Sequence, residues 1–380
     1  MKDLSFANNP YNDDKLISCC SIFGMMSVKG RTYSGSDIMA AIGNMHDRGN
    51  GLGGGFAVYG IYPDYADYYA MHIMCMDDRA RTEVETYLRE GFELVKSELI
   101  PTRQAPGVTD PPAIMRYFVT PKPSCDTDMP EDDYVVGRVM FINTCIEGAY
   151  VFSSGKNMGV FKGVGFPEDI GNHFCLDDYQ GYLWTAHGRF PTNTQAWWGG
   201  AHPFSILDST VVHNGEISSY GINKRFLEMF GYKCTMHTDT EVIAYAVDLL
   251  KRRHGLPVEL MAKVLSPPLW SLLPYMDKDE QEICRALRQV YGSLLMNGPF
   301  TIIIAHEGEM IGLTDRVRLR PLVAAVRDDM LYLSSEESSI RLISPELDDV
   351  WSPMGGEPVI GRLGQPLPMS KAKEMALGSV

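Results

Sequence analysis

The stretch Cys20-Ser21-Ile22-Phe23-Gly24-Met25-Met26-Ser27-Val28 decides the fold of this chain of 380 residues. It is a compact apolar run, typical of a strand that is buried on both faces. Residues 1–19 before it are polar and rich in turn-forming residues, and they are interpreted as a leader or propeptide. Cys20 therefore stands at the junction between a loose leader and a buried strand.

That position gives Cys20 two possible roles. The default for an internal cysteine is core packing. If the leader is removed, Cys20 becomes the first residue, and its α-amino group, with a reference pKa of ~7.7–8.0, lies beside its own thiol. The amine can then take the thiol proton without a histidine, so one residue supplies both nucleophile and base. Cys19 is the other candidate for the new N-terminus.

The bulk composition limits the possible partners. The chain has 34 Lys and Arg against 48 Asp and Glu, a formal charge of −14, which is the wrong sign for nucleic acid or an anionic membrane. No apolar stretch approaches the ~20 residues of a membrane span. Eight scattered cysteines form no CxxC pair, which is typical of reduced thiols and predicts a cytoplasmic protein without a metal site. A small-molecule substrate or a protein partner is more plausible.

The order of predicted elements favours an α+β fold, because helices and strands mix without a βαβ rhythm. A glycine-rich turn at 48–55 follows a predicted helix at 36–46, so it does not meet the context of a dinucleotide fingerprint. Residues 79–98 are predicted as one amphipathic helix, residues 101–132 as mostly irregular, and residues 134–142 as a strand. The segment 79–132 is interpreted as an insertion or small lobe. The remaining predictions are strands near 56–63, 67–76, 149–162, 300–306, 309–314, 322–327 and 330–334, and helices at 222–230, 239–253 and within 256–291.

Five short motifs occur in a fixed order along the chain. They are Cys20–Gly24, Arg48-Gly49, His187–Thr194 (HGRFPTNT), His213–Ile217 (HNGEI) and Thr238–Glu241 (TDTE). Together they closely resemble the class II glutamine amidotransferase domain. The HGRFPTNT run and residues 162–170 resemble the amidotransferase part of glutamate synthase, close to the separately encoded archaeal-type subunit. The resemblance runs from about residue 20 to residue 362.

The resemblance implies a fold, the four-layer αββα sandwich of N-terminal-nucleophile hydrolases. It places that domain at 20–365, with insertions at about 79–132 and 256–292, and leaves 366–380 as a C-terminal tail. The family usually has glycine directly after the nucleophile, whereas this chain has Ser21. Serine is also small, so we expect it to be tolerated.

The resemblance also implies roles for individual residues. The Asn214 side-chain amide and the Gly215 backbone N–H would form the oxyanion hole; on the dipeptide alone a hairpin turn would be favoured. Arg189 would bind the α-carboxylate of glutamine and Asp239 its α-ammonium group, although alone they would be a surface charge and a helix N-terminal acid. Arg48 would help to hold Cys20. Thr192 and His213 complete the predicted substrate-binding set, and His187 and His213 are interpreted as structural rather than as bases.

These roles predict a glutaminase reaction. L-glutamine and water would give glutamate and ammonia through a thioester on Cys20, and a glutamate synthase partner subunit, in an expected hetero-oligomer, would receive the ammonia. By resemblance that partner carries FMN and an iron–sulfur cluster, and no cofactor is expected in this chain. Three alternatives stay open: an N-methylglutamate synthase subunit, a non-catalytic interaction subunit of the same fold, and a hydrolase of another amide.

Overall fold

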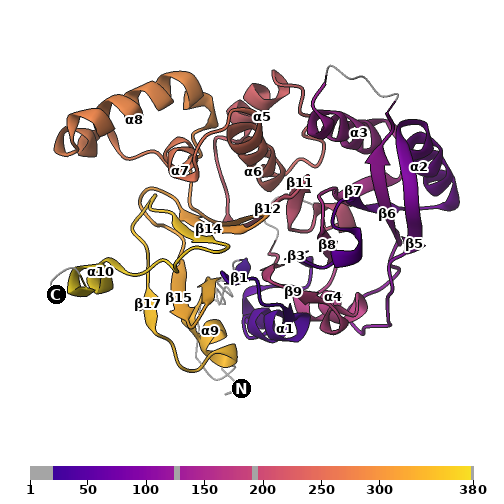
Figure 1. Ribbon diagram of the computed structural model, residues 1–380, viewed down its shortest axis with the longest axis horizontal. Helices are drawn as coiled ribbons and strands as arrows, with labels where there is room; N and C mark the ends of the chain where they lie inside the picture. The colour runs from indigo at the N-terminus through magenta and orange to yellow at the C-terminus, as the bar shows by residue number, and fades with distance from the viewer. Residues whose placement is uncertain (1–19, 124–128, 191–195, 378–380) are drawn as a thin grey trace, which may run out of the picture.

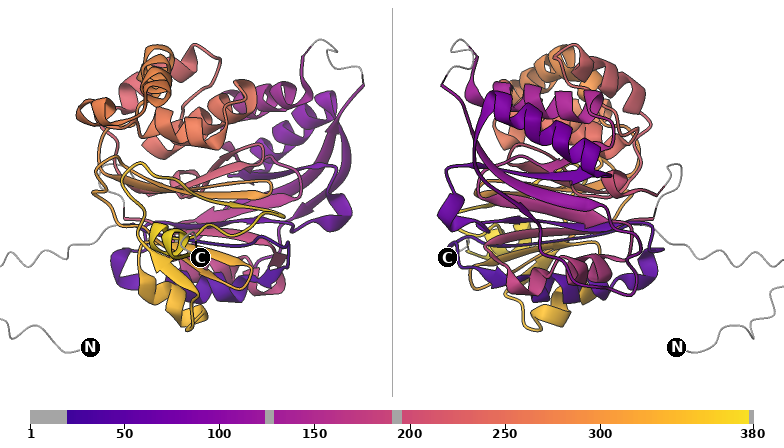
Figure 2. Two further views of the ribbon diagram at one scale, coloured as in Figure 1. Left: turned by 60° about the vertical axis from the view of Figure 1, so that its left-hand side comes forward. Right: turned by 90° about the vertical axis from the view of Figure 1, so that its right-hand side faces the viewer.

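The structure is a computed structural model that describes residues 20–123, 129–190 and 196–377. Two stacked layers of antiparallel strands lie between two layers of helices (Figure 2). One strand layer is a seven-stranded sheet, and the other consists of a five-stranded and a four-stranded sheet. This arrangement confirms the expected α+β class and the four-layer αββα sandwich. No helix of the described residues is both long and apolar enough to cross a membrane.

The strands of each sheet are given in their spatial order. The seven-stranded sheet is β17 (Asp349–Trp351), β15 (Val323–Arg327), β16 (Met330–Ser334), β1 (Ser21–Ser27), β10 (Leu183–Gly188), β3 (Gly54–Tyr59) and β8 (Met158–Gly163). The five-stranded sheet is β11 (Phe204–Ile206), β12 (Ser209–Gly215), β13 (Phe300–His306), β14 (Glu309–Thr314) and β18 (Val359–Arg362). The four-stranded sheet is β5 (Phe92–Leu99), β6 (Ala113–Pro121), β4 (Tyr69–Cys75) and β7 (Ala149–Ser153). A two-stranded ribbon joins β2 (Tyr33–Ser34) and β9 (Gln180–Gly181).

Helices cover the outer face of each strand layer (Figures 1 and 2). The seven-stranded sheet carries α1 (Gly35–Gly43), α4 (Pro167–His173) and α9 (Glu337–Ile343). The other layer carries α2 (Asp78–Gly91), α3 (Glu131–Cys145), α5 (Tyr220–Glu228), α6 (Asp239–Asp248), α7 (Val258–Leu265) and α8 (Lys278–Tyr291). Shorter turns are η5 (Trp198–Gly200), η6 (Leu249–Arg253) and η7 (Trp270–Tyr275), and α10 (Lys371–Leu377) lies within the predicted tail.

Strand β1 lies inside the seven-stranded sheet, between β10 and β16, as its apolar composition predicts. All seven of its residues are buried. Gly24 lies where the two strand layers meet, since a Cβ at this position would come within 2.8 Å of the Met310 sulfur. The same core cluster contains Phe23 of β1 and Ile303 of the facing sheet. The apolar run therefore holds Cys20 at the end of a strand that is fixed on both sides.

The segment 79–132 differs from its predicted secondary structure. The helix α2 ends at Gly91, and residues 92–99 form β5, in which the buried Phe92 is followed by alternating exposed and partly buried positions, so the predicted helix at 79–98 is wrong in its second half. Residues 113–121, predicted to be irregular, form β6, which pairs with β4 of the flanking chain. The segment thus contributes two strands to a sheet that it shares with β4 and β7.

Residues 134–142 were predicted as a strand and instead lie within α3. The valines and the aromatic residues favour a strand by propensity. Three acidic residues at positions 131–133 occupy the first turn, where they interact favourably with the helix dipole. Val135, Val139 and Ile142 are buried at helical spacing, so packing against the sheet overrides the intrinsic preference.

Candidate active site

Cys20 lies directly before β1, and its thiol faces the start of the segment that follows β10. The Phe190 backbone N–H donates to the Cys20 Sγ at 3.3 Å, and the thiol lies 3.8 Å from the Phe190 carbonyl. Arg48 donates from Nε to the Cys20 carbonyl at 3.4 Å and pairs with Glu336 at 2.7 Å. The structure therefore places Arg48 against Cys20, as the resemblance predicts.

Ser21 is accommodated by the strand beside it. Ser21 is opposite Gly188 in the β1–β10 pair and is 1% exposed. A Cβ on Gly188 would overlap the Ser21 hydroxyl. Glycine on β10 thus supplies the room that the family usually gains from glycine on β1.

Asn214 and Gly215 end β12, in the layer that faces β1. Asn214 is 1% exposed, and its Nδ2 lies 3.5 Å from the Ser335 hydroxyl, which also accepts the Ile22 N–H at 3.2 Å. Ser335 therefore connects the Asn214 amide to the strand that begins beside Cys20. Gly215 has a φ of 145°, and a Cβ there would overlap the Pro299 carbonyl. Only glycine fits this backbone position.

Asp239 is the first residue of α6, which Thr238 caps. Its carboxylate accepts the Ile217 N–H at 3.0 Å and lies 3.5 Å from Nδ1 of His213. Burial alone would raise the pKa of Asp239, but the His213 ring and the hydrogen bonds outweigh burial, so the pKa lies below its usual value. Asp239 is thus an anion at neutral pH, and its contact with the His213 ring helps to orient its carboxylate.

Arg189 extends from the end of β10 into the same region and is 5% exposed. Gly53 makes room for it, since a Cβ at Gly53 would lie 3.0 Å from Arg189 Cδ. Burial lowers the pKa of Arg189, and the charges of Cys20 and Asp239 oppose this effect. These three predicted residues, from three separate motifs, therefore share one electrostatic environment.

The histidines of this region are fully buried. His187 Nε2 lies 2.9 Å from the His213 carbonyl, and the rings of His187 and His202 are 4.1 Å apart. Burial lowers the pKa of His187 to about 3, so its ring is neutral at physiological pH.

A buried carboxyl supports the loop before α6. Glu241 accepts the N–H groups of Thr235 and Met236 at 3.1 and 2.9 Å. Burial raises the pKa of Glu241 to about 7. Lys162, also fully buried, donates to the Gly199 and Pro203 carbonyls at 3.0 and 3.2 Å. Sequence reasoning missed both supports, because burial and loop contacts leave no local pattern.

Some of the predicted residues are not described by the structure. Thr192 and the leader lie outside the described residues. The contacts of Ser335 with Asn214 and of Glu336 with Arg48 are seen only in the structure. In the part of the chain that the structure describes, no three His, Cys, Asp or Glu side chains are grouped to hold a metal ion.

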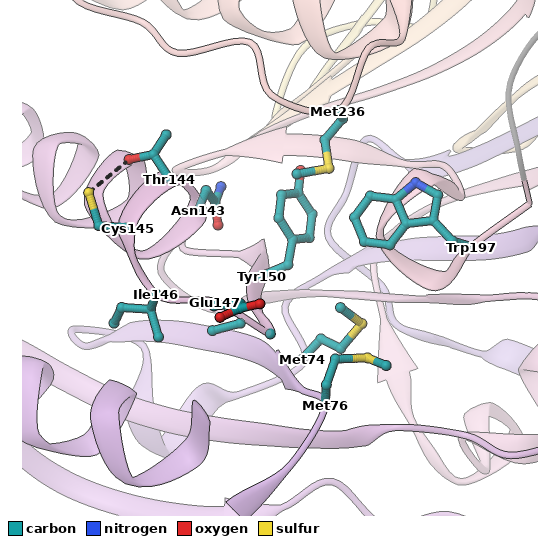
Figure 3. Close-up of a pocket in the computed structure, with 12 residues that line it drawn as sticks. Met74, Met76, Asn143, Thr144, Cys145, Ile146, Glu147, Tyr150, Trp197 and Met236 are labelled. Carbon is teal, nitrogen blue, oxygen red and sulfur yellow. Dashed lines mark hydrogen bonds between the residues drawn. The ribbon is translucent and has the colours of Figure 1, made fainter. Parts of the chain in front are cut away.

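A pocket of about 530 Å³ lies beside the loop that Glu241 holds (Figure 3). Met236, whose N–H bonds to Glu241, lines it together with Trp197 and Tyr150. Met74 and Met76 line the side that faces these rings in Figure 3. The lining combines three methionines and two aromatic rings with Asn143, Thr144 and the carboxylate of Glu147, and it contains no arginine, unlike the site around Cys20.

Comparison with known proteins gave matches over most of the chain. A family model described as glutamine amidotransferases class-II matches residues 65–237. An uncharacterized protein of Archaeoglobus fulgidus is 56% identical over 367 residues, 96% of both chains. A putative glutamine amidotransferase of Methanothermobacter thermautotrophicus is 26% identical over 85% of this chain and 93% of its own. A ferredoxin-dependent glutamate synthase 2 of Synechocystis is 27% identical over 74% of this chain but only 20% of its own.

Proposed function

We propose a function from the premise that this chain belongs to the class II glutamine amidotransferases: it hydrolyses L-glutamine with Cys20 as the nucleophile. The observation that carries the proposal is the convergence of Cys20, Arg189 and Asp239 beside Asn214 and Gly215. An anion, a guanidinium and a thiol in one buried region match the three groups of glutamine that must be bound or attacked: its α-ammonium, its α-carboxylate and its side-chain amide.

The proposed reaction begins after removal of residues 1–19. The Cys20 α-amine takes the thiol proton, and the thiolate attacks the amide carbon of the glutamine side chain. The Asn214 amide and the Gly215 N–H bind the oxyanion; losing one such donor typically lowers kcat ~10²–10³-fold. The C–N bond then breaks, the amine returns the proton to the leaving ammonia, and a thioester remains on Cys20. Water attacks the thioester and releases glutamate.

We further assign the ammonia to a glutamate synthase-type partner subunit. Support comes from the likeness to the ferredoxin-dependent glutamate synthase 2 of Synechocystis. The FMN and the iron–sulfur cluster would belong to the partner subunit, and the two chains would form a hetero-oligomer.

The test is the intact mass of the purified chain before and after treatment with 6-diazo-5-oxo-L-norleucine, a glutamine-mimicking diazoketone, with and without the partner. We expect a mass that begins at Cys20 and a single covalent adduct. Cys20→Ala should abolish the adduct, while Cys145→Ala, at an exposed thiol elsewhere, should leave it. A full-length chain that forms no adduct even with the partner present would overturn the proposal.

A further inference from the structure

A loop in which arginines alternate with apolar residues leaves the end of β14. It reads Asp315-Arg316-Val317-Arg318-Leu319-Arg320-Pro321. The buried Asp315 carboxylate accepts the N–H groups of Val317 and Leu319 at 3.0 and 2.8 Å. The buried Asp315 side chain therefore fixes the shape of the loop. Val317 and Leu319 are nevertheless 53% and 62% exposed, so the fold holds two branched aliphatic side chains in solvent.

Neighbouring segments extend this surface. Arg318 donates to the Pro353 carbonyl at 3.2 Å, next to the exposed Met354. Gly356 lies against Ser266, shortly before η7. The first residue of η7, Trp270, is 63% exposed, and the Arg288 guanidinium of α8 lies 3.8 Å from the centre of its ring. We call this surface the arginine face; its residues are Trp270, Arg288, Arg316, Val317, Arg318, Leu319, Arg320 and Met354.

The charge of the arginine face is opposite to that of the chain. Among the ion pairs of the described residues, none involves Arg288, Arg316, Arg318 or Arg320. Arg316 bonds instead to the side-chain oxygen of Asn297 at 3.2 Å, and Arg288 bonds to a backbone carbonyl. Glu357, beside Met354, is paired with Lys371. The face is thus a positive, partly apolar area on a protein of net charge −14.

The arginine face adjoins the proposed oxyanion residues. Asn214 pairs with Thr301 of β13, and Thr301 pairs with Thr314, the last residue of β14. The loop therefore begins two strands from Asn214, which corresponds to about 10 Å at the usual strand spacing. Asn297, which Arg316 contacts, lies two residues before Pro299, whose carbonyl accepts the Glu216 N–H at 3.0 Å.

We propose that the arginine face docks an acidic surface of the subunit that receives the ammonia. This proposal rests on the proposed function, which requires such a subunit. Tryptophan and arginine are enriched among residues that dominate binding energy, and contiguous exposed apolar groups mark interaction surfaces. A local positive area is what an acidic partner needs in order to approach a chain that is negative overall. A partner docked on the arginine face would also cover the surface beside Asn214 and shield released ammonia from solvent.

The experiment measures binding of the purified chain to the glutamate synthase-type flavoprotein subunit of the same organism by isothermal titration calorimetry. Arg316→Glu and Leu319→Asp should each weaken binding by at least about 10-fold, the effect of losing one strong interface contact. Raising the salt from about 50 to 200 mM should weaken wild-type binding. Matched controls are Arg89→Glu on α2 and Leu342→Asp on α9, both exposed and on other surfaces; they should leave binding within about twofold.

Two results would overturn the docking proposal: no binding by the wild-type chain, or equal weakening by the control variants. Self-association of the chain that Leu319→Asp abolishes, measured by light scattering, would assign the face to a second copy instead. The adduct on Cys20 separates the two proposals. Docking variants that keep the adduct but lose binding support both, whereas a wild-type chain that binds the partner but forms no adduct contradicts only the proposed function.

Discussion

The two segments that interrupt the sandwich, 79–132 and 256–292, are used in different ways. The first packs its helix and strands into the core, where Val84, Leu88 and Phe92 lie with Tyr117 of β6. The second packs α7 into the same core, but its η7 and α8 present apolar residues to solvent, including Tyr275, which is 88% exposed, and Val290. In Figure 1, α8 lies at the edge of the molecule, whereas β5 and β6 continue a sheet. The first addition therefore extends a sheet, and the outer part of the second provides surface.

The largest expected difference between the segments is in stability. Phe92 is 1% exposed, and Phe92→Ala should lower the free energy of unfolding by ~3–5 kcal/mol, since truncation leaves a cavity. Denaturant unfolding measures the change. Val95→Ala, at a half-exposed position of the same strand, is the control and should change stability by less than ~0.5 kcal/mol. Equal losses at both positions would show that the first segment is not a packed part of the core.

Acid should next destabilise the sheet that the first segment joins. His72 of β4, the strand that pairs with β6, is fully buried, and its pKa is lowered to about 3 by burial and by Arg116 of β6. An unfolded histidine titrates near ~6.5, so between these values the unfolded chain binds one more proton. His72 alone should therefore lower the free energy of unfolding as the pH drops below ~6.5, by roughly 3 kcal/mol at pH 4.5. Denaturant unfolding of His72→Gln across this range should show a pH dependence that is smaller by about one proton; an unchanged dependence would contradict the assignment.

Neither segment contains a histidine, but the first pairs with β4, which carries the buried His72, so the same acid range offers an internal comparison. Amide hydrogen exchange should show that β4 and β6 lose protection between pH 7 and 4.5 before α7 does, after correction for the intrinsic exchange rate. Earlier loss in α7 would reverse the comparison.

A smaller effect is expected at Trp270. The Trp270 side chain is exposed, and the Arg288 guanidinium lies 3.8 Å from the centre of its ring. A cation–π contact at such an exposed site contributes ~0.5–1 kcal/mol. Trp270→Ala should lower the free energy of unfolding by this amount, measured by denaturant unfolding. Trp270→Phe should restore part of it. A loss comparable to that of Phe92→Ala would mean that the second segment is structural after all.

The smallest effect is expected at Tyr275. Because the side chain is almost fully in solvent, Tyr275→Ser should change the free energy of unfolding by less than ~0.5 kcal/mol. Thermal unfolding of the variant beside the wild type tests this. A large loss would show that the ring packs on the chain in solution.

The fold could be predicted in outline because motif order and the apolar run at 20–28 belong to the chain itself. The errors fell where local preference and packing disagree. Residues 134–142 have strand-forming composition, but the flank of the four-stranded sheet needed a helix, and Val135 and Val139 satisfy that need at helical spacing. The helix at 79–98 was extended through Gly91 because the apolar positions on either side continue its spacing.

The sequence named candidate residues for the site but not the groups that support them. Cys20, Arg189 and Asp239 lie within one electrostatic environment, and their roles are predictions. The Ser335 hydroxyl contacts both Asn214 and Ile22. Ile22 and Ser335 are more than 300 residues apart in the sequence, so no local pattern indicates this contact. Glu241 and Lys162 are ordinary in sequence and acquire their roles only through burial.

The pair Ser21 and Gly188 limits the order in which substitutions can accumulate beside the nucleophile. A Cβ at position 188 would lie 2.4 Å from the Ser21 hydroxyl, so a chain with Ser21 accepts alanine at position 188 only after that hydroxyl is removed or turned away. Alanine or glycine at position 21 removes it. In descent or in design, the exchange at position 21 is therefore expected to come before a side chain appears at position 188.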